Sequence, residues 1–195
     1  MKLLLHACCA PCSTVVLERL TADRNVFGGG GELALFYCNP NIFPQGEYYK
    51  RLGELRRFVS GLTPPDGVRL TEPVAPEYSH AEFLQAVSGL ENEPEGGARC
   101  IKCFELRLRK TAQAARDGGF DAFATTLTVG SRKRSADINA VGEAAAQEYG
   151  VRYLAEDFKK RGGFQRSVEL SREHSLYRQG YCGCEFALPP SRDTT

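Results

Sequence analysis

The chain alternates between short apolar runs and longer amphipathic stretches. The apolar runs are typical of buried strands. These predicted strands span residues 2–7, 33–37, 68–70, 122–127 and 151–154. Apolar residues at helical spacing predict helices over residues 13–20, 45–60, 81–89, 99–116, 136–149 and 164–176. Strands that alternate with helices predict an α/β fold with a Rossmann-like parallel sheet and helices on both faces.

Length and composition limit the kind of protein. With 195 residues and 42% hydrophobic content, the chain can bury one core of ordinary size, so we expect a single domain over residues 1–195 with a cysteine-containing C-terminal tail. The 25 basic and 24 acidic residues give a net charge of +1, so any nucleic-acid surface must be a local patch. No run approaches the roughly 20 apolar residues of a membrane span. The apolar run before Cys8 is too short for a secretory signal. We expect a cytoplasmic protein with no membrane partner.

The chain contains eight cysteines. In a reducing cytosol they favour metal binding or redox chemistry over a disulfide framework. Three groups are Cys8, Cys9 and Cys12; Cys100 and Cys103; and Cys182 and Cys184. Cys38 stands alone in an apolar context, which is typical of a small buried residue.

Two of these groups have ligand-like positions. Cys100 and Cys103 are spaced i, i+3 at the start of a predicted helix, where unpaired N–H groups stabilise thiolates. Cys8 and Cys9 follow the first predicted strand, and sites gather at the carboxyl ends of parallel strands. The two pairs could therefore converge and supply the four thiolates of a 4Fe-4S cluster. A zinc site explains the spacing equally well.

The third cysteine group points to redox chemistry. A bond between Cys182 and Cys184 would close a small, strained ring that is easily reduced. This spacing favours a reversible redox pair, with metal ligation as the alternative.

Local basic runs are the candidates for contact with nucleic acid. They span residues 107–110, 132–134 and 159–161. The second run follows the fourth predicted strand on the side of the site, so we expect Arg132, Lys133 and Arg134 to contact phosphates of a nucleic acid. The first run is typical of a solvated helix face. The tyrosines that could stack on an extruded base are Tyr48, Tyr177 and Tyr181.

Five short motifs, spread over nearly the whole chain, carry a family resemblance. They are His6-Ala7-Cys8-Cys9-Ala10-Pro11-Cys12, Asn39-Pro40-Asn41-Ile42 with Glu47-Tyr48, Arg99-Cys100 to Cys103-Phe104, Thr125-Thr126-Leu127, and Tyr177-Arg178-Gln179 to Tyr181-Cys182-Gly183-Cys184. In this order they resemble the QueH-type epoxyqueuosine reductase family. One departure is Val129-Gly130-Ser131, which replaces the family's usual Ser-Pro before the basic residue.

The resemblance implies a fold similar to the PP-loop ATPases (HUP-like) and a tRNA-modifying oxidoreductase. Its reaction would be the cobalamin-independent reduction of epoxyqueuosine to queuosine at the wobble position of tRNA, the last step of queuosine biosynthesis. The implied cluster ligands are Cys8, Cys9, Cys100 and Cys103, with Cys12 as a further candidate, and the implied redox-active catalytic pair is Cys182 with Cys184. A different partition stays open, in which three cysteines hold the 4Fe-4S cluster and others hold an additional iron ion. The electron donor is not identified by the sequence.

Two other classes of protein fit parts of the pattern. An ATP-using tRNA sulfurtransferase would need a glycine-rich pyrophosphate loop after the first strand, but residues 8–12 are cysteine-rich instead. A zinc-stapled RNA-binding module would use the same cysteines without catalysis. Colour separates this module from the reductase, because zinc thiolates are colourless and 4Fe-4S proteins are brown.

Overall fold

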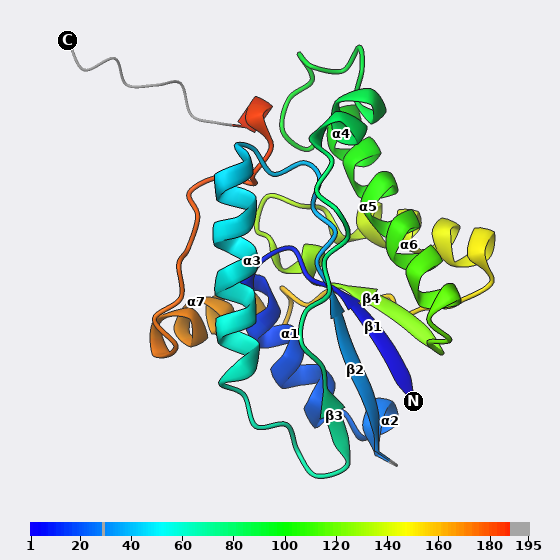
Figure 1. Cartoon of the computed structure of the whole chain (residues 1–195), viewed down its shortest axis with the longest axis vertical. Helices are drawn as coiled ribbons and strands as arrows, with labels where there is room; N and C mark the ends of the chain where they lie inside the picture. Colours follow the sequence, from blue (N-terminus) through cyan, green and yellow to red (C-terminus); the bar gives the residue numbers. More distant parts are fainter. Residues whose placement is uncertain (29, 188–195) are drawn as a thin grey trace.

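A five-stranded sheet forms the centre of the molecule, as the computed structural model shows over residues 1–28 and 30–187 (Figure 1). The strands are β1 (Lys2–His6), β2 (Gly31–Phe36), β3 (Val68–Leu70), β4 (Ala122–Thr125) and β5 (Arg152–Tyr153). They lie in the order β3-β2-β1-β4-β5, and every pair of neighbours is parallel. This arrangement confirms the predicted Rossmann-like parallel sheet.

The helices fall close to the predicted stretches. They are α1 (Ala10–Ala22), α2 (Arg24–Phe27), α3 (Gln45–Ser60), α4 (His80–Ala86), α5 (Ala98–Asp117), α6 (Ser135–Tyr149) and α7 (Gly163–Glu173), with short 3-10 helices η1 (Thr126–Val129) and η2 (Glu185–Ala187). Helix α1 begins three residues before the prediction, because Pro11 suits a first helical turn. Within the described ranges, no helix has the length and apolar character needed to cross a membrane.

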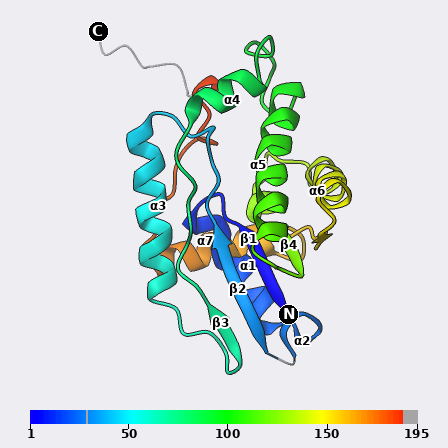
Figure 2. The same cartoon turned by 45° about the vertical axis from the view of Figure 1, so that its right-hand side comes forward.

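Helices cover both faces of the sheet (Figure 2). Successive side chains of a strand point to opposite faces. Leu3 and Leu5 of β1 therefore pack in one core cluster with apolar residues of α1, α3 and α7. Leu4 packs in a second cluster with residues of α5 and α6. Since both faces are buried, the strands read as continuous apolar runs rather than as alternating ones.

The strand order reverses next to β1. The chain adds β2 and β3 on one side of β1 and then adds β4 and β5 on the other side. Ligands of such sheets bind outside the carboxyl ends of the strands at this reversal. Here the carboxyl ends of β1 and β4 lead directly into α1 and η1, and this end of the sheet holds the cysteines.

Candidate functional site

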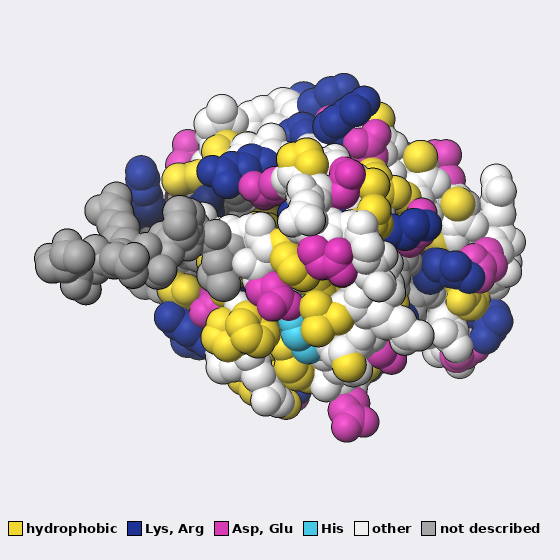
Figure 3. All heavy atoms as spheres, turned by 90° about the horizontal axis from the view of Figure 1, so that it is seen from above, with side chains coloured by type: hydrophobic (Ala, Val, Ile, Leu, Met, Phe, Trp, Pro, Cys, Tyr) yellow, Lys and Arg dark blue, Asp and Glu magenta, His cyan; other side chains and the backbone are white. Residues whose placement is uncertain are grey.

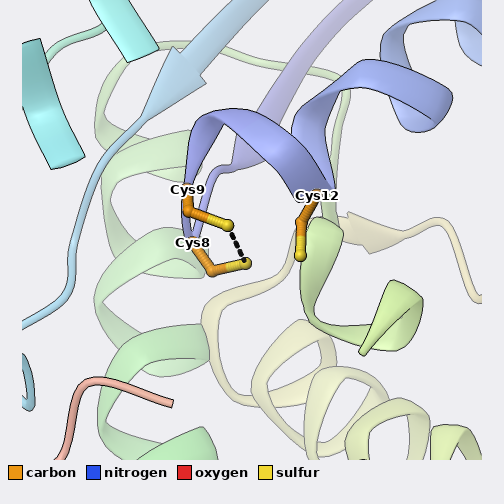
Figure 4. Close-up of side chains that lie close together, drawn as sticks. All are labelled: Cys8, Cys9 and Cys12. Atoms are coloured by element: carbon orange, nitrogen blue, oxygen red, sulfur yellow. Dashed lines mark hydrogen bonds between the residues drawn. The ribbon is translucent and has the colours of Figure 1, made fainter. Parts of the chain in front are cut away.

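Three thiols gather at the start of α1, directly after β1 (Figure 4). The sulfur atoms of Cys8, Cys9 and Cys12 all lie within 4.8 Å of one another, and the first two are 3.8 Å apart. Across residues 1–28 and 30–187, no other three or more His, Cys, Asp or Glu side chains lie this close. We call these three cysteines the N-terminal thiol group. Cys12, the further candidate from the sequence, is thus part of it.

Polar side chains at the end of β4 position this thiol group. The Cys8 amide donates a hydrogen bond to Thr126 Oγ1 (2.9 Å), and that hydroxyl donates to Cys8 Sγ (3.2 Å). His6 Nδ1 lies 2.9 Å from Thr125 Oγ1, and its Nε2 lies 3.1 Å from the carbonyl of Cys38. Burial, together with the charge of Arg107, lowers the pKa of His6 to about 3, so this imidazole is neutral.

The three thiols share their protons unequally. Hydrogen bonds from Cys12 and Cys9 hold the pKa of Cys8 well below its usual value, so Cys8 is the most acidic thiol of the group. The hydrogen bond to Cys8 raises the pKa of Cys12. Cys12 lowers the pKa of Cys9, but the bond to Cys8 and burial outweigh this and raise it to about 12. Three sulfur atoms within 4.8 Å of one another are a donor set that suits a thiophilic metal.

Four further thiols line one pocket, and we call them the pocket thiols. They are Cys100 and Cys103 from the first turns of α5, and Cys182 and Cys184 from the C-terminal segment. Burial raises the pKa of Cys103 and raises that of Cys184 to about 11. The structure thus unites the second and third cysteine groups of the sequence. The assignment of Cys100 and Cys103 to one cluster with Cys8 and Cys9 stays a prediction.

The segment 177–187, which we call the C-terminal strap, carries two of the pocket thiols. Arg51 of α3 is buried, pairs with Glu47 at 2.7 Å and donates a hydrogen bond to the Cys182 carbonyl at 3.1 Å. The Phe43 amide donates to the Gly183 carbonyl at 2.8 Å. The further anchors of the strap are the Glu54 carboxylate, which accepts from the Tyr177 amide (2.6 Å), and the His80–Glu185 contact (2.7 Å).

Arg107 is a site residue that the sequence interpretation missed. The basic run 107–110 was expected on a solvated helix face, yet Arg107 is only 2% exposed. Its Nη1 lies 3.8 Å from Cys103 Sγ, and its Nη2 donates to Asn39 Oδ1. The spacing of four residues from Cys103, between the apolar Phe104 and Leu108, is the signal that could have placed it on the buried face of α5.

The residues expected to contact RNA differ in exposure. The side chains of Arg132 and Arg134 are 73% and 79% exposed at the edge of the pocket. Lys133 is half-buried and lines the pocket. Figure 3 views this end of the molecule and shows Lys and Arg side chains spread over several parts of the surface among acidic ones, and hydrophobic side chains around a histidine.

The three tyrosines proposed to stack on a base have other roles in the structure. Tyr48 is buried in the core, which removes it as a stacking surface. Tyr177 donates a hydrogen bond to Glu47 at 3.1 Å, and Tyr181 donates to the Phe43 carbonyl at 2.6 Å. Both therefore secure the strap.

Fold and site together define a Rossmann-like protein with two groups of thiols at the strand-order reversal, a class suited to metal-dependent or redox chemistry. The family model described as epoxyqueuosine reductase QueH matches residues 3–189. The chain belongs to this family of tRNA-modifying oxidoreductases, as the motifs predicted.

Several proteins described as epoxyqueuosine reductase QueH are similar to the chain. The one from Streptococcus pyogenes serotype M1 is 43% identical over 186 residues, which cover 95% of this chain and 70% of that protein. The one from Staphylococcus epidermidis is 40% identical, with coverage of 95% and 76%. The one from Thermotoga maritima is 35% identical, with coverage of 97% and 92%. A solved structure, a predicted subunit of tRNA methyltransferase from Methanocaldococcus jannaschii, is 14% identical with a TM-score of 0.49 over 88% of this chain and 76% of that chain.

Proposed function

We propose that the chain reduces epoxyqueuosine to queuosine at the wobble position of tRNA without cobalamin, using a 4Fe-4S cluster and the thiols of Cys182 and Cys184. The observation that carries the proposal is the N-terminal thiol group, with three sulfurs within 4.8 Å of one another at the end of β1. A pocket lined by four more cysteines adjoins this group, since Cys8 and Cys9 pack in one cluster with Cys100 of the pocket. We infer the substrate, epoxyqueuosine in tRNA, from the description of the family to which the chain belongs.

The reaction removes one oxygen atom from the substrate. The epoxide becomes an alkene, and its oxygen leaves as water after the uptake of two electrons and two protons. A bound 4Fe-4S cluster would supply electrons one at a time. The proposed dithiol of Cys182 and Cys184 could release two electrons and two protons as it forms a disulfide, and an external electron donor must then reduce it.

Sulfur ligands for the metal are available in both groups. We propose Cys8, Cys9, Cys100 and Cys103 as ligands, and the position of Cys12 within the N-terminal thiol group supports it as a further ligand. The alternative partition, with three cysteines on the cluster and others on an additional iron ion, is compatible with two separate thiol groups. Both versions use Cys8, whose lowered pKa favours the thiolate form that a metal ligand needs.

The substrate tRNA needs contacts outside the thiol groups. We propose that Arg132 and Arg134 contact phosphates of the anticodon loop, because both are exposed at the edge of the pocket. The proposal treats residues 1–195 as one domain that works in the cytoplasm, where tRNA is used. Lys133, the third residue of the predicted RNA contact, is half-buried and lines the pocket.

The test begins with protein purified without oxygen. Iron and sulfide are quantified, and conversion of epoxyqueuosine tRNA to queuosine is followed by nucleoside mass spectrometry with a chemical reductant. We expect iron-dependent conversion by the wild-type protein. Cys8→Ser is expected to lose most of the iron and the conversion. Cys38→Ala is the matched control, since this buried cysteine lies outside both thiol groups and its loss is expected to leave both readouts intact.

The metal content and the conversion assay can also refute the proposal. Zinc in place of iron, with no conversion after cluster reconstitution, would refute the reductase proposal and favour the zinc-stapled RNA-binding module.

A further inference from the structure

Arg107 is a buried cation without an acidic partner. In the described part of the chain it forms no ion pair with any carboxylate, and its Nε has no hydrogen-bond partner. Its other two nitrogens face Cys103 Sγ and the Asn39 amide oxygen. An uncompensated buried charge costs several kcal/mol, so this guanidinium needs a negative group that the carboxylates do not supply.

Lys133 is a second cation at the site, and it is half-buried. Its aliphatic stem packs over Gly130, where an added Cβ would lie 3.3 Å from Lys133 Cδ. From there the side chain lines the pocket that holds Cys100, Cys103, Cys182 and Cys184. The two flanking arginines each reach a carboxylate, Arg132 with Glu95 at 3.1 Å and Arg134 with Asp137 at 3.5 Å. Among residues 1–28 and 30–187, Lys133 has no such partner.

The groups that face these two cations are thiols from both parts of the site. Burial lowers the pKa of Arg107, but the charges of Cys103, Cys8 and Cys182 raise it by more. Burial likewise lowers the pKa of Lys133, and Cys182, Cys8 and Cys12 reverse that effect. Geometry agrees for the pocket thiols, because Arg107 Nη1 lies 3.8 Å from Cys103 Sγ and Lys133 lines the pocket that holds all four of them. Both cations therefore favour negative charge on these thiols.

We propose that Arg107 and Lys133 are the counter-charges of the metal–thiolate group, and that they raise its reduction potential rather than bind RNA phosphates. This inference rests on the proposed function. A metal–thiolate cluster becomes more negative on reduction, and net charge around a cluster is one determinant of its potential. Positive charge held in a low-dielectric interior therefore stabilises the reduced form.

The test compares neutral and charge-keeping variants after anaerobic reconstitution. Iron content, the reduction potential from an EPR-monitored redox titration, and the affinity for tRNA are measured for each protein. For Lys133→Gln and Arg107→Gln we expect potentials more negative than that of the wild type. Lys133→Arg and Arg107→Lys keep the positive charge, so we expect their reduction potentials to stay close to that of the wild type. Arg109→Gln is the matched control on α5, because this arginine is 53% exposed and pairs with Glu148.

A variant of an exposed arginine should show the reverse pattern, with altered tRNA binding and an unaltered reduction potential. Arg132→Gln is expected to weaken tRNA binding without a shift in potential. If Arg107→Gln does not fold, the reduction potential of Lys133→Gln alone still tests whether the cations raise the potential of the metal–thiolate group. Neutral variants that hold iron at the wild-type potential, or that lose only tRNA affinity, would overturn the inference and leave the proposed function standing. A wild-type protein that takes up no iron would overturn both.

Discussion

Gly183 separates Cys182 from Cys184, and its backbone has a φ of +116°. This region of conformational space is open to glycine and strained for other residues. An added Cβ would lie 2.9 Å from both Arg51 Nη1 and Ile42 Cγ1. The glycine therefore lets the strap approach the buried guanidinium that binds the Cys182 carbonyl.

Gly183→Ala should displace the strap. Backbone strain of this kind costs about 1–3 kcal/mol, and the close contacts with Arg51 and Ile42 oppose the native position. We expect Cys184, which is buried in the native protein, to react faster with iodoacetamide, as measured by mass spectrometry of the labelled peptide. Gly180→Ala is the control, since nothing lies within 4 Å of an added Cβ there. Equal labelling rates in the wild type and Gly183→Ala would contradict the role of Gly183.

Single residues also show where prediction from the sequence stopped. The cysteine groups could be recognised from spacing, but the buried position of Arg107 could not be read from a run of basic residues. Arginine enters a core when its nitrogens find specific partners, and the partners here come from Cys103 and from Asn39 after β2. Such contacts depend on tertiary structure and leave only a weak local pattern.

At the scale of single elements, the apolar pattern predicted the five strands and six longer helices well. The missed elements are α2, η1 and η2, each of three or four residues. So short a helix has too little periodicity to be recognised. The predicted fourth strand extended to residue 127, whereas β4 ends at Thr125. Its apolar run continues into η1, where the Thr125 hydroxyl accepts a hydrogen bond from the Leu127 amide (3.1 Å).

Two glycines in helices should respond oppositely to alanine. Gly53 of α3 has nothing within 4 Å of an added Cβ, so Gly53→Ala should stabilise the protein by about 0.5–1 kcal/mol. At Gly142 of α6 the added Cβ would overlap the ring of Tyr153 from β5. Gly142→Ala should therefore destabilise it by about 1–3 kcal/mol. Urea unfolding measures both changes, and shifts of the same sign would refute the packing of α6 on β5.

The contact between α3 and the strap predicts a pH dependence. The hydrogen bond from Arg57, aided by the Tyr177 amide, lowers the pKa of Glu54 below its ordinary value of 4.5. A lowered carboxyl pKa stabilises the fold above the unfolded pKa, and this stability is lost as the pH falls through the folded pKa. The effect is small, because Arg57 is 54% exposed and solvent screens its charge.

Glu54→Gln tests this contact. We expect its unfolding free energy to be lower than that of the wild type at pH 7 and this difference to shrink as the pH falls toward 3, as measured by urea unfolding. A gap of the same size at both pH values would show that the Glu54 charge is not responsible.

Across the whole molecule, two basic runs meet although they are distant in the sequence. The Lys159 ammonium donates a hydrogen bond to the Lys133 carbonyl, which joins the loop 157–162 to the edge of the pocket. Arg19 fixes the same loop by donating to the carbonyls of Phe158, Lys160 and Arg161 at 3.0 to 3.1 Å. The runs 132–134 and 159–161 thus form one basic surface on a chain whose net charge is only +1.

This surface predicts a measurable salt dependence. If Lys160, which is 75% exposed, contacts a tRNA phosphate, Lys160→Gln should reduce the slope of log affinity against log salt by about 1. Fluorescence anisotropy with labelled tRNA over a salt series measures the slope. Arg109→Gln, on the surface of α5 beside Glu148, should leave it unchanged. An unaltered slope in Lys160→Gln would exclude this loop from the RNA surface.

The strap brings two late cysteines of the chain to the pocket thiols of α5, and this affects how the protein is made. Translation delivers Cys8 early, but the pocket beside it is closed by Cys182 and Cys184, which leave the ribosome far later. Chains emerge at about 5–20 residues per second and begin to fold from their N-terminal part. For roughly ten seconds or more, then, a nascent chain carries the N-terminal cysteines without the thiols of the strap, and the pocket can be completed only after residue 184 has been released.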